Sequence, residues 1–130
     1  MNRREYERIN SKTEGAFYVR KDGELIYDFV GVIDNISEEG ICVFVNANEY
    51  KQVDSLLEMG QEISFQAFDE EGYGIEAESG AFHGHVQIVR KTMEGNQLTI
   101  GCKTVGNNNT FQEYVENKKT YLFIKSINAE

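Results

Sequence analysis

The sequence predicts a single all-β domain, a small barrel or sandwich of six strands, followed by one C-terminal helix. Three observations favour this class. The chain has 130 residues, which is the length of one domain with its own core. It contains six short segments of alternating or continuous apolar residues, and turns rich in Gly, Asn and acidic residues separate them. Because the sequence has no proline and no internal repeat, we expect residues 1–130 to form one domain.

The strand assignments depend on residue type and on a period of two. β-Branched and aromatic residues dominate the first two segments, and the third is almost entirely apolar. The last three place apolar residues at every second position, and Glu94-Gly95-Asn96 between the final two is typical of a hairpin turn. The predicted strands cover residues 16–20, 25–33, 41–45, 63–67, 82–88 and 98–102.

Two segments depart from the strand period. Residues 50–58, with Asn48 as a candidate cap, are compatible with a short helix or with a turn at the rim. Residues 110–126 are predicted to be helical, because Thr110 and Glu113 have the spacing of a capping box. We expect this helix to pack across the barrel through the apolar residues that share one helical face, which are Phe111, Tyr114, Val115, Tyr121 and Leu122.

Charge is divided unevenly along the chain, whose net charge is −9. Residues 1–21 hold six basic and three acidic side chains, whereas the remaining residues hold seven basic and nineteen acidic ones, a net of −12. Binding to long nucleic acid or to an anionic membrane scales with the number of charges that are neutralised. We therefore expect neither a nucleic-acid partner nor a membrane partner, although a local basic arm could hold a small anion.

The rest of the composition indicates a soluble cytoplasmic protein. No apolar run approaches the ~20 residues of a membrane span, and the polar start of the chain does not resemble a secretory signal. Cys42 and Cys102 lie in strand-like segments, without the paired spacing of a metal site or a disulfide framework. We expect both to be free core thiols in a reducing compartment.

Sequence signatures of catalysis are absent. The chain has no glycine-rich phosphate loop, no Gly-x-Ser-x-Gly and no His-Glu-x-x-His. His83 and His85 would share one face of a strand, but the sequence supplies no third ligand for a metal ion. We therefore predict that the protein is not an enzyme and that it requires neither a metal ion nor a cofactor.

Two clusters stand out from this background. Near the start of the chain, Arg4 and Arg8 are spaced as R-x-x-x-R, and Arg3 precedes them. About thirty residues later, between two apolar strands, the chain reads Asn35-Ile36-Ser37-Glu38-Glu39-Gly40, an N-x-S-x-x-G pattern. Each cluster alone is weak evidence, but their order and spacing together are specific.

Together these clusters resemble the two signature motifs of PilZ domains, the bacterial receptors for cyclic di-GMP. The resemblance covers nearly the whole chain, because Met59-Gly60-Gln61, Gly84-His85-Val86 and Gly101-Cys102-Lys103 also follow the order of the family. It implies a six-stranded antiparallel β-barrel of the PilZ-like, split-barrel type with a C-terminal α-helix. It also implies a receptor that changes conformation on binding cyclic di-GMP and signals to a downstream protein.

The resemblance also implies which residues bind the ligand. Arg4 and Arg8 would grip phosphate oxygens or a guanine edge through the paired N–H groups of the guanidinium, with Arg3 as a further helper. Residues 1–12 are expected to form a mobile arm that closes over the ligand. The barrel would contribute Asn35, Ser37 and Gly40.

The two ends of the second motif raise separate questions. At the position of Asn35 the family has Asp or Asn, and an amide pairs more weakly with guanine than a carboxylate but does not repel phosphate. A shifted register would expose Asp34 instead, because neighbouring strand residues point to opposite faces; we favour Asn35. Gly40 suits a positive φ or a close approach of the backbone to the ligand.

Other functions stay open. Glu5, Glu7, Glu38 and Glu39 lie in or beside the motifs and could repel an anion, which would leave a degenerate PilZ-like module that only contacts proteins. Its docking surface would be the barrel and the C-terminal helix, rich in Tyr114, Tyr121 and Phe123. The negative charge of the chain disfavours a single-stranded nucleic-acid binder. The pattern is compatible with one or two ligand molecules and with any oligomeric state.

Overall fold

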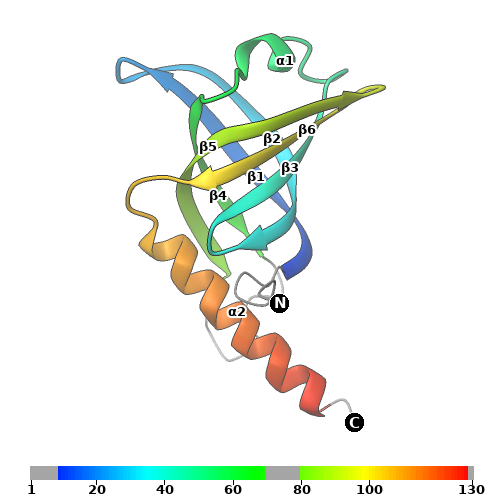
Figure 1. The fold of residues 1–130 in the computed structure, drawn as a ribbon, viewed down its shortest axis with the longest axis vertical. Helices are drawn as coiled ribbons and strands as arrows, with labels where there is room; N and C mark the ends of the chain where they lie inside the picture. The colour runs from blue at the N-terminus through cyan, green and yellow to red at the C-terminus, as the bar shows by residue number, and fades with distance from the viewer. Residues whose placement is uncertain (1–8, 70–79, 129–130) are drawn as a thin grey trace.

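The computed structural model describes residues 9–69 and 80–128 of the chain. Six antiparallel strands close into a barrel in the order β1-β2-β3-β6-β5-β4, and a long helix follows them (Figure 1). The predicted all-β class, the six-stranded barrel and the C-terminal helix are confirmed. The elements are β1 (Ile9–Lys21), β2 (Glu24–Ser37), β3 (Gly40–Asn46), α1 (Val53–Leu56), β4 (Glu62–Phe68), β5 (Ala81–Glu94), β6 (Gln97–Thr104) and α2 (Asn109–Asn128).

The first strand begins earlier than the sequence pattern indicates. β1 and β2 pair along their whole length, from Ile9 opposite Ile36 to Lys21 opposite Glu24. Residues 9–12, which we expected in the arm, therefore belong to β1. Backbone pairing with β2 sets this boundary, and polar residues take part in such pairing as readily as apolar ones.

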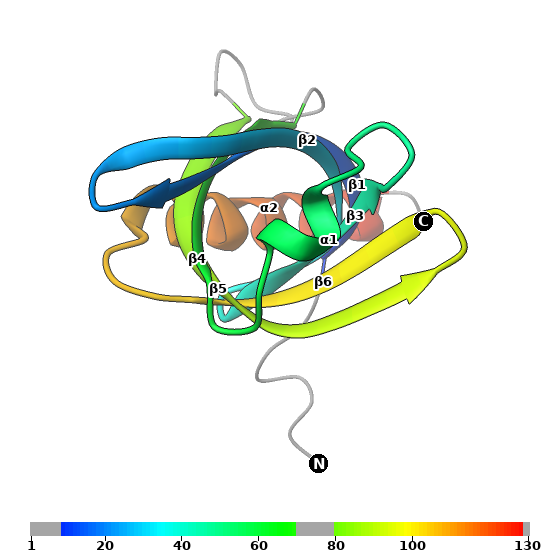
Figure 2. The same ribbon diagram turned by 90° about the horizontal axis from the view of Figure 1, so that it is seen from above.

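The two helices lie at opposite ends of the barrel (Figure 2). α1 is shorter than the segment 50–58, and Gln52 rather than Asn48 occupies its N-cap position, without a side-chain cap. Val53 and Leu57 are fully buried. This short helix therefore covers one opening of the barrel, whereas α2 crosses the other.

Aromatic rings connect the barrel interior to the first half of α2. Phe65 of β4 contacts Phe111 of α2 edge to face, with ring centroids 5.7 Å apart. Phe82 of β5 stacks on Tyr114 of α2 at 4.0 Å. Phe111, Tyr114 and Val115 are fully buried. The predicted apolar face of the helix thus closes the barrel core, and each such ring pair adds ~0.5–1.5 kcal/mol beyond its buried area.

The start of α2 differs from the predicted capping box. Thr110 lies inside the first turn, and its hydroxyl donates to the carbonyl oxygen of His83 at 3.0 Å. Asn108 instead anchors the helix start, because its Oδ1 accepts the backbone N–H of His85 at 2.6 Å and its Nδ2 donates to the Val105 carbonyl at 2.7 Å. The predicted capping box is therefore wrong. The hydroxyl of Thr110 and the Oδ1 of Asn108 find their hydrogen-bond partners on β5, which is far away in sequence.

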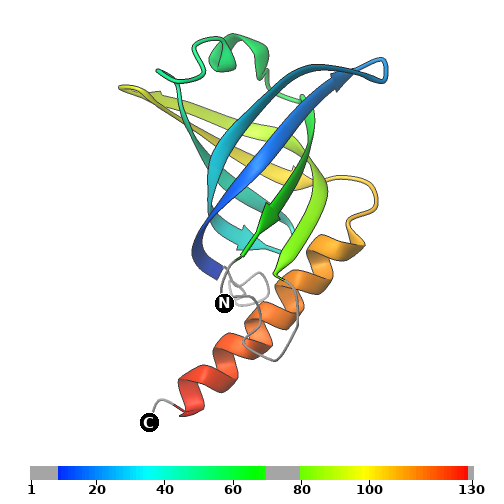
Figure 3. The same ribbon diagram turned by 180° about the vertical axis from the view of Figure 1, so that it is seen from behind.

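A buried ion pair fastens α2 to the residue that follows β4. Lys118 Nζ lies 2.8 Å from Asp69 Oδ2, and the two side chains are only 2% and 7% exposed. The hydroxyl of Tyr114 donates to the same carboxylate oxygen at 2.6 Å. Beyond this point α2 extends away from the barrel (Figure 3). The barrel thus holds the helix by its first half.

We expect Lys118→Met to lower the free energy of unfolding by about 3 kcal/mol, because the substitution leaves Asp69 buried without its counter-ion. Lys119→Met is the matched control, since it removes a more exposed pair with Glu38 and should cost less than about 1 kcal/mol. Chemical denaturation followed by circular dichroism measures both losses. Equal losses would contradict the anchoring role of Lys118.

Candidate functional site

The second motif forms the turn between β2 and β3, at the end of the barrel where α2 lies (Figure 1). Ser37 pairs with Gly40, and Glu38 and Glu39 make the turn between them. Ser37 is 7% exposed, and its Oγ accepts the backbone N–H of Glu39 at 3.3 Å. Among the described residues, none accepts the hydrogen of this hydroxyl. Ser37 can therefore donate a hydrogen bond to a ligand.

Gly40 is explained by strand packing. It is not among the residues with positive φ, so the first of the two alternatives suggested by the sequence, a left-handed backbone, does not apply. A Cβ at this position would overlap the carbonyl oxygen of Cys102 on β6, while Gly40 itself pairs with Lys103. The missing side chain lets β3 and β6 pair closely at the point where the turn begins.

A β-bulge precedes the turn. In the ladder between β2 and β3, Ile33 faces Val43 and Asn35 faces Cys42, so Asp34 is an extra residue on β2. Asn35 Nδ2 donates to Asp34 Oδ2 at 3.3 Å. The two side chains therefore lie together, contrary to the opposite faces that strand alternation predicts.

A hollow of about 180 Å³ opens beside the turn. Ser37 and Gly40 line it, whereas Asn35 is not among its described lining residues and faces one of them, Cys42, across the ladder. Arg3, Arg4 and Arg8 lie outside the described residues. The lining comprises Ser37, Glu39, Gly40, Ile41, Cys42, Val89, Arg90, Gly101, Cys102 and Lys103.

Two cations that the sequence analysis did not single out line this hollow. Arg90 comes from β5 and Lys103 from β6, and both are exposed. Glu39 is the one carboxylate among the described lining residues, so the lining carries a net charge of +1. The signal that could have revealed Arg90 is Gly101 within β6, because a glycine inside a strand often marks the close approach of another group.

Two cysteines line the hollow, and neither forms a disulfide. Cys102 is buried, as predicted, whereas Cys42 is only half-buried. Burial, and to a smaller extent the neighbouring Cys42, raises the pKa of the Cys102 thiol from 9.0 to about 12, although the charge of Arg90 acts in the opposite direction. Cys102 is therefore protonated at neutral pH and does not act as a nucleophile.

The turn is connected directly to α2. Lys119 Nζ lies 2.7 Å from Glu38 Oε1, and both side chains are partly buried. The pair neutralises one of the acidic residues that would otherwise repel an anion. Because Glu38 lies between Ser37 and Gly40, a displacement of the turn would also act on the helix.

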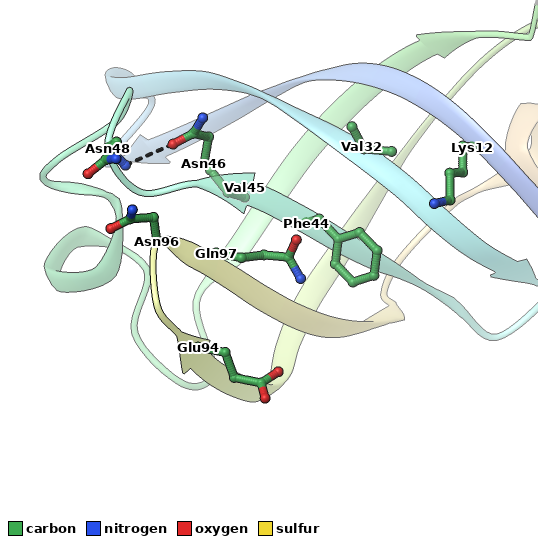
Figure 4. A pocket seen from close by; sticks show the side chains of 9 residues that line it. All are labelled: Lys12, Val32, Phe44, Val45, Asn46, Asn48, Glu94, Asn96 and Gln97. Atoms are coloured by element: carbon green, nitrogen blue, oxygen red, sulfur yellow. Dashed lines mark hydrogen bonds between the residues drawn. The ribbon is translucent and has the colours of Figure 1, made fainter.

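A larger groove of about 570 Å³ lies on the barrel surface, over β2, β3 and the β5–β6 hairpin (Figure 4). Val32 and Phe44 give it apolar surface, and side-chain amides such as that of Asn46 surround them. Its charged residues, Lys12 and Glu94, have opposite signs. The groove shares no described lining residue with the hollow at the turn, and it suits an anion less well.

The two histidines considered as metal ligands lie on the surface of the barrel. His83 and His85 are exposed on β5, and His85 Nδ1 lies 3.0 Å from Ser64 Oγ. Within residues 9–69 and 80–128, no three His, Cys, Asp or Glu side chains come together as ligands for a metal ion. The helices in that part of the chain all lack the length and apolar character needed to cross a membrane.

Comparison with solved structures identifies the fold. No protein-family model and no curated protein matches the chain. The PilZ domain of YcgR from Escherichia coli, solved with cyclic di-GMP, matches with a TM-score of 0.60 and 14% identity, covering 98% of this chain and 96% of that domain. The MrkH–cyclic di-GMP complex from K. pneumonia gives 0.62 and 14%, covering 100% of this chain and 57% of MrkH. The Bacillus subtilis inhibitor of motility MotI gives 0.61 and 13%, covering 92% and 53%.

The chain therefore has a PilZ-like fold, as the two sequence motifs indicated. It spans nearly the whole YcgR domain but only about half the length of MotI and MrkH. At 13–14% identity the likeness concerns the fold.

We expect Gly40→Ala to lower the free energy of unfolding by about 3 kcal/mol, because the added methyl group overlaps a backbone carbonyl that cannot move without breaking the β3–β6 ladder. Gly15→Ala is the control, since a Cβ there meets the ends of the Ile33 and Phe17 side chains at 3.2 Å, and these can shift. Urea denaturation compares the two variants. A loss at Gly40 no greater than the loss at Gly15 would contradict the packing explanation.

In a Cys42→Ala background, we expect folded Cys102 to react with iodoacetamide at pH 8 about 100-fold more slowly than the unfolded chain, because its thiolate is scarce. Its pKa rises from 9.0 to about 12 on folding. The stability contributed by the protonated thiol is therefore present below pH 9 and lost as pH rises toward 12. Equal rates of reaction in the two states would contradict the raised pKa.

Proposed function

We propose that this protein is a cytoplasmic receptor for cyclic di-GMP and acts by binding, not by catalysis. The observation that carries the proposal is the position of Ser37 and Gly40, which line a hollow with two cations on a fold shared with domains solved with this nucleotide. Cyclic di-GMP presents two phosphate anions. A hydroxyl donor, a guanidinium and an ammonium are the groups that bind such anions.

Arg4 and Arg8 are proposed to supply the part of the site that the barrel lacks. The hollow of about 180 Å³ is smaller than the ~300–1,000 Å³ of typical small-molecule sites, so a dinucleotide needs contacts from outside it. Arg8 directly precedes Ile9, which pairs with Ile36, the neighbour of Ser37. Chain connectivity therefore ties Arg8 to the turn.

Asn35 is proposed to contact a guanine together with Asp34. A guanine edge offers N–H donors and the O6 acceptor, and a carboxylate beside an amide can meet both kinds of group. The 3.3 Å hydrogen bond between the two side chains supports a joint role, which differs from the role of Asn35 alone that the sequence suggested.

Signalling is proposed to pass through α2. The Glu38–Lys119 pair joins the turn to the helix, and the second half of that helix extends beyond the barrel (Figure 3). A ligand that moves the turn changes this contact and so shifts the population of helix positions. A downstream protein that contacts the helix would read this change.

A second candidate is a protein-docking module that binds no nucleotide. Phe123, Ile124 and Ile127 are 66%, 45% and 55% exposed near the end of α2, which favours a protein contact at this face. Tyr114, which we expected on the docking surface, is fully buried in the core instead. The docking surface therefore excludes Tyr114.

Isothermal titration with cyclic di-GMP tests the proposed function. We expect saturable binding by the wild-type protein, no detectable heat with Arg8→Ala, and affinity about 10-fold weaker with Ser37→Ala because one hydrogen bond to a charged group is lost. Arg20→Ala is the control, because Arg20 is exposed at the opposite end of β1 and should leave affinity unchanged.

A flat titration of wild-type protein at millimolar ligand would contradict the receptor and leave the docking module. Equal affinity in Arg8→Ala and Arg20→Ala would contradict the role of the arginine motif. Thermal melting of each variant confirms that it is folded before titration.

A further inference from the structure

We propose that Arg90, assisted by Lys103, binds a phosphate group of the ligand, so that the barrel itself supplies part of the positive charge of the site. The inference rests on the proposed function and adds residues outside both sequence motifs. The ligand class is a phosphodiester anion.

A β-bulge places Arg90 on the barrel surface. Every second residue of β5 up to Ile88 is buried, and a regular strand would send Arg90 into the core as the next member of that series. In the ladder with β6, Ile88 faces Cys102 and Arg90 faces Gly101, so Val89 is an extra residue. The bulge reverses the alternation and brings Arg90 to the hollow.

Gly101 holds the guanidinium flat against β6. A Cβ on Gly101 would lie 2.7 Å from Arg90 Nη2, 3.0 Å from Cζ and 3.2 Å from Nε. Because all three atoms are nearly equidistant from one point, the plane of the guanidinium lies over the glycine. Its N–H groups then point sideways along the surface, the orientation needed to grip an oxyanion with two parallel hydrogen bonds.

Arg90 and Lys103 have no ionic partner within the described part of the chain, whereas three lysines there are paired with carboxylates. Lys91 pairs with Asp54 at 3.1 Å, Lys118 with Asp69 and Lys119 with Glu38. No hydrogen bond or ion pair to another described residue involves the side chain of Arg90 or Lys103. Exposed cations without an ionic partner also occur elsewhere on the described barrel, as at Arg20 and Lys21. Only Arg90 and Lys103 among the described cations line one hollow together with the hydroxyl of Ser37, and this convergence favours an external anion there.

The chemistry favours phosphate over a base edge. Lys103 is a point charge without the planar geometry that reads a guanine, but it suits a phosphate oxygen. The hydroxyl hydrogen of Ser37 and the guanidinium of Arg90 line the same hollow, and both are donors to oxygen. Glu39, at its edge, disfavours a second anion there. One phosphodiester group is therefore the occupant.

The test is titration of cyclic di-GMP into the full chain at low and at high salt. We expect Arg90→Gln to weaken binding about 10- to 100-fold and Lys103→Gln about 3- to 10-fold at low salt, since each loses a charged contact. Arg90→Lys should bind about 3- to 10-fold more weakly than the wild type but more tightly than Arg90→Gln, because it keeps the charge and loses the parallel pair of hydrogen bonds. Salt should weaken the wild type more than Arg90→Gln, because screening acts on charged contacts.

Arg20→Gln is the matched control and should leave affinity and salt dependence unchanged. Gly101→Ala is a second probe, because it displaces the guanidinium without removing its charge; we expect at least fivefold weaker binding from a protein that melts cooperatively. Wild-type affinity in Arg90→Gln overturns the proposal, and so does Arg90→Lys binding as weakly as Arg90→Gln, because the charge at this position would then contribute nothing to binding. Those outcomes leave the proposed function intact if Arg8→Ala still abolishes binding, whereas a flat wild-type titration overturns the proposed function itself.

Discussion

Two β-bulges, at Asp34 in β2 and at Val89 in β5, determine which side chains reach the surface around Ser37. In a closed barrel every strand has one face in the core, so a polar residue in the wrong phase would be buried at a cost of several kcal/mol if charged. One extra residue reverses the phase locally while the ladder continues on either side. The bulges thus let a tightly packed barrel present Asp34 with Asn35, and Arg90, beside one turn.

The alternation of core and surface residues, and its interruption by bulges, also explains which parts of the fold and the site could be predicted from the sequence. The period of two predicted the six strands, because one face of each must be apolar to fill the barrel. The spacing within residues 35–40 revealed Ser37 and Gly40, because a turn keeps its residues close together. Arg90 was missed because strict alternation assigns it to the core. The prediction of an N-cap at Thr110 was wrong because its hydroxyl donates to a carbonyl oxygen on β5. A partner so far away in sequence leaves no signal in the residues around Thr110.

The attachment of α2 follows from the same closed core. Phe111 and Tyr114 fill the end of the barrel with aromatic surface, and Lys118 adds a buried ion pair whose strength depends on exclusion of water. The next residue, Lys119, instead forms a more exposed pair with Glu38 of the turn. A strong attachment and a weak one therefore stand side by side on one helix. A force at the turn alters the weak contact first and leaves the barrel closed, which suits a helix that reports on the turn.

The distribution of cations can be understood from repulsion in the empty protein. Four like charges packed into one rigid hollow would repel one another strongly unless carboxylates paired with them, and such carboxylates would then exclude an anionic ligand. Among the described residues that line the hollow, the cations are Arg90 and Lys103, and both are exposed to solvent that screens them. The R-x-x-x-R pair lies on a separate segment of the chain, directly before β1. If these arginines meet Arg90 and Lys103 only when a ligand with two phosphates is bound, the negative charge of the ligand compensates the repulsion among the four cations. Affinity then depends on both sets together, and removal of either should weaken binding by more than its own contacts.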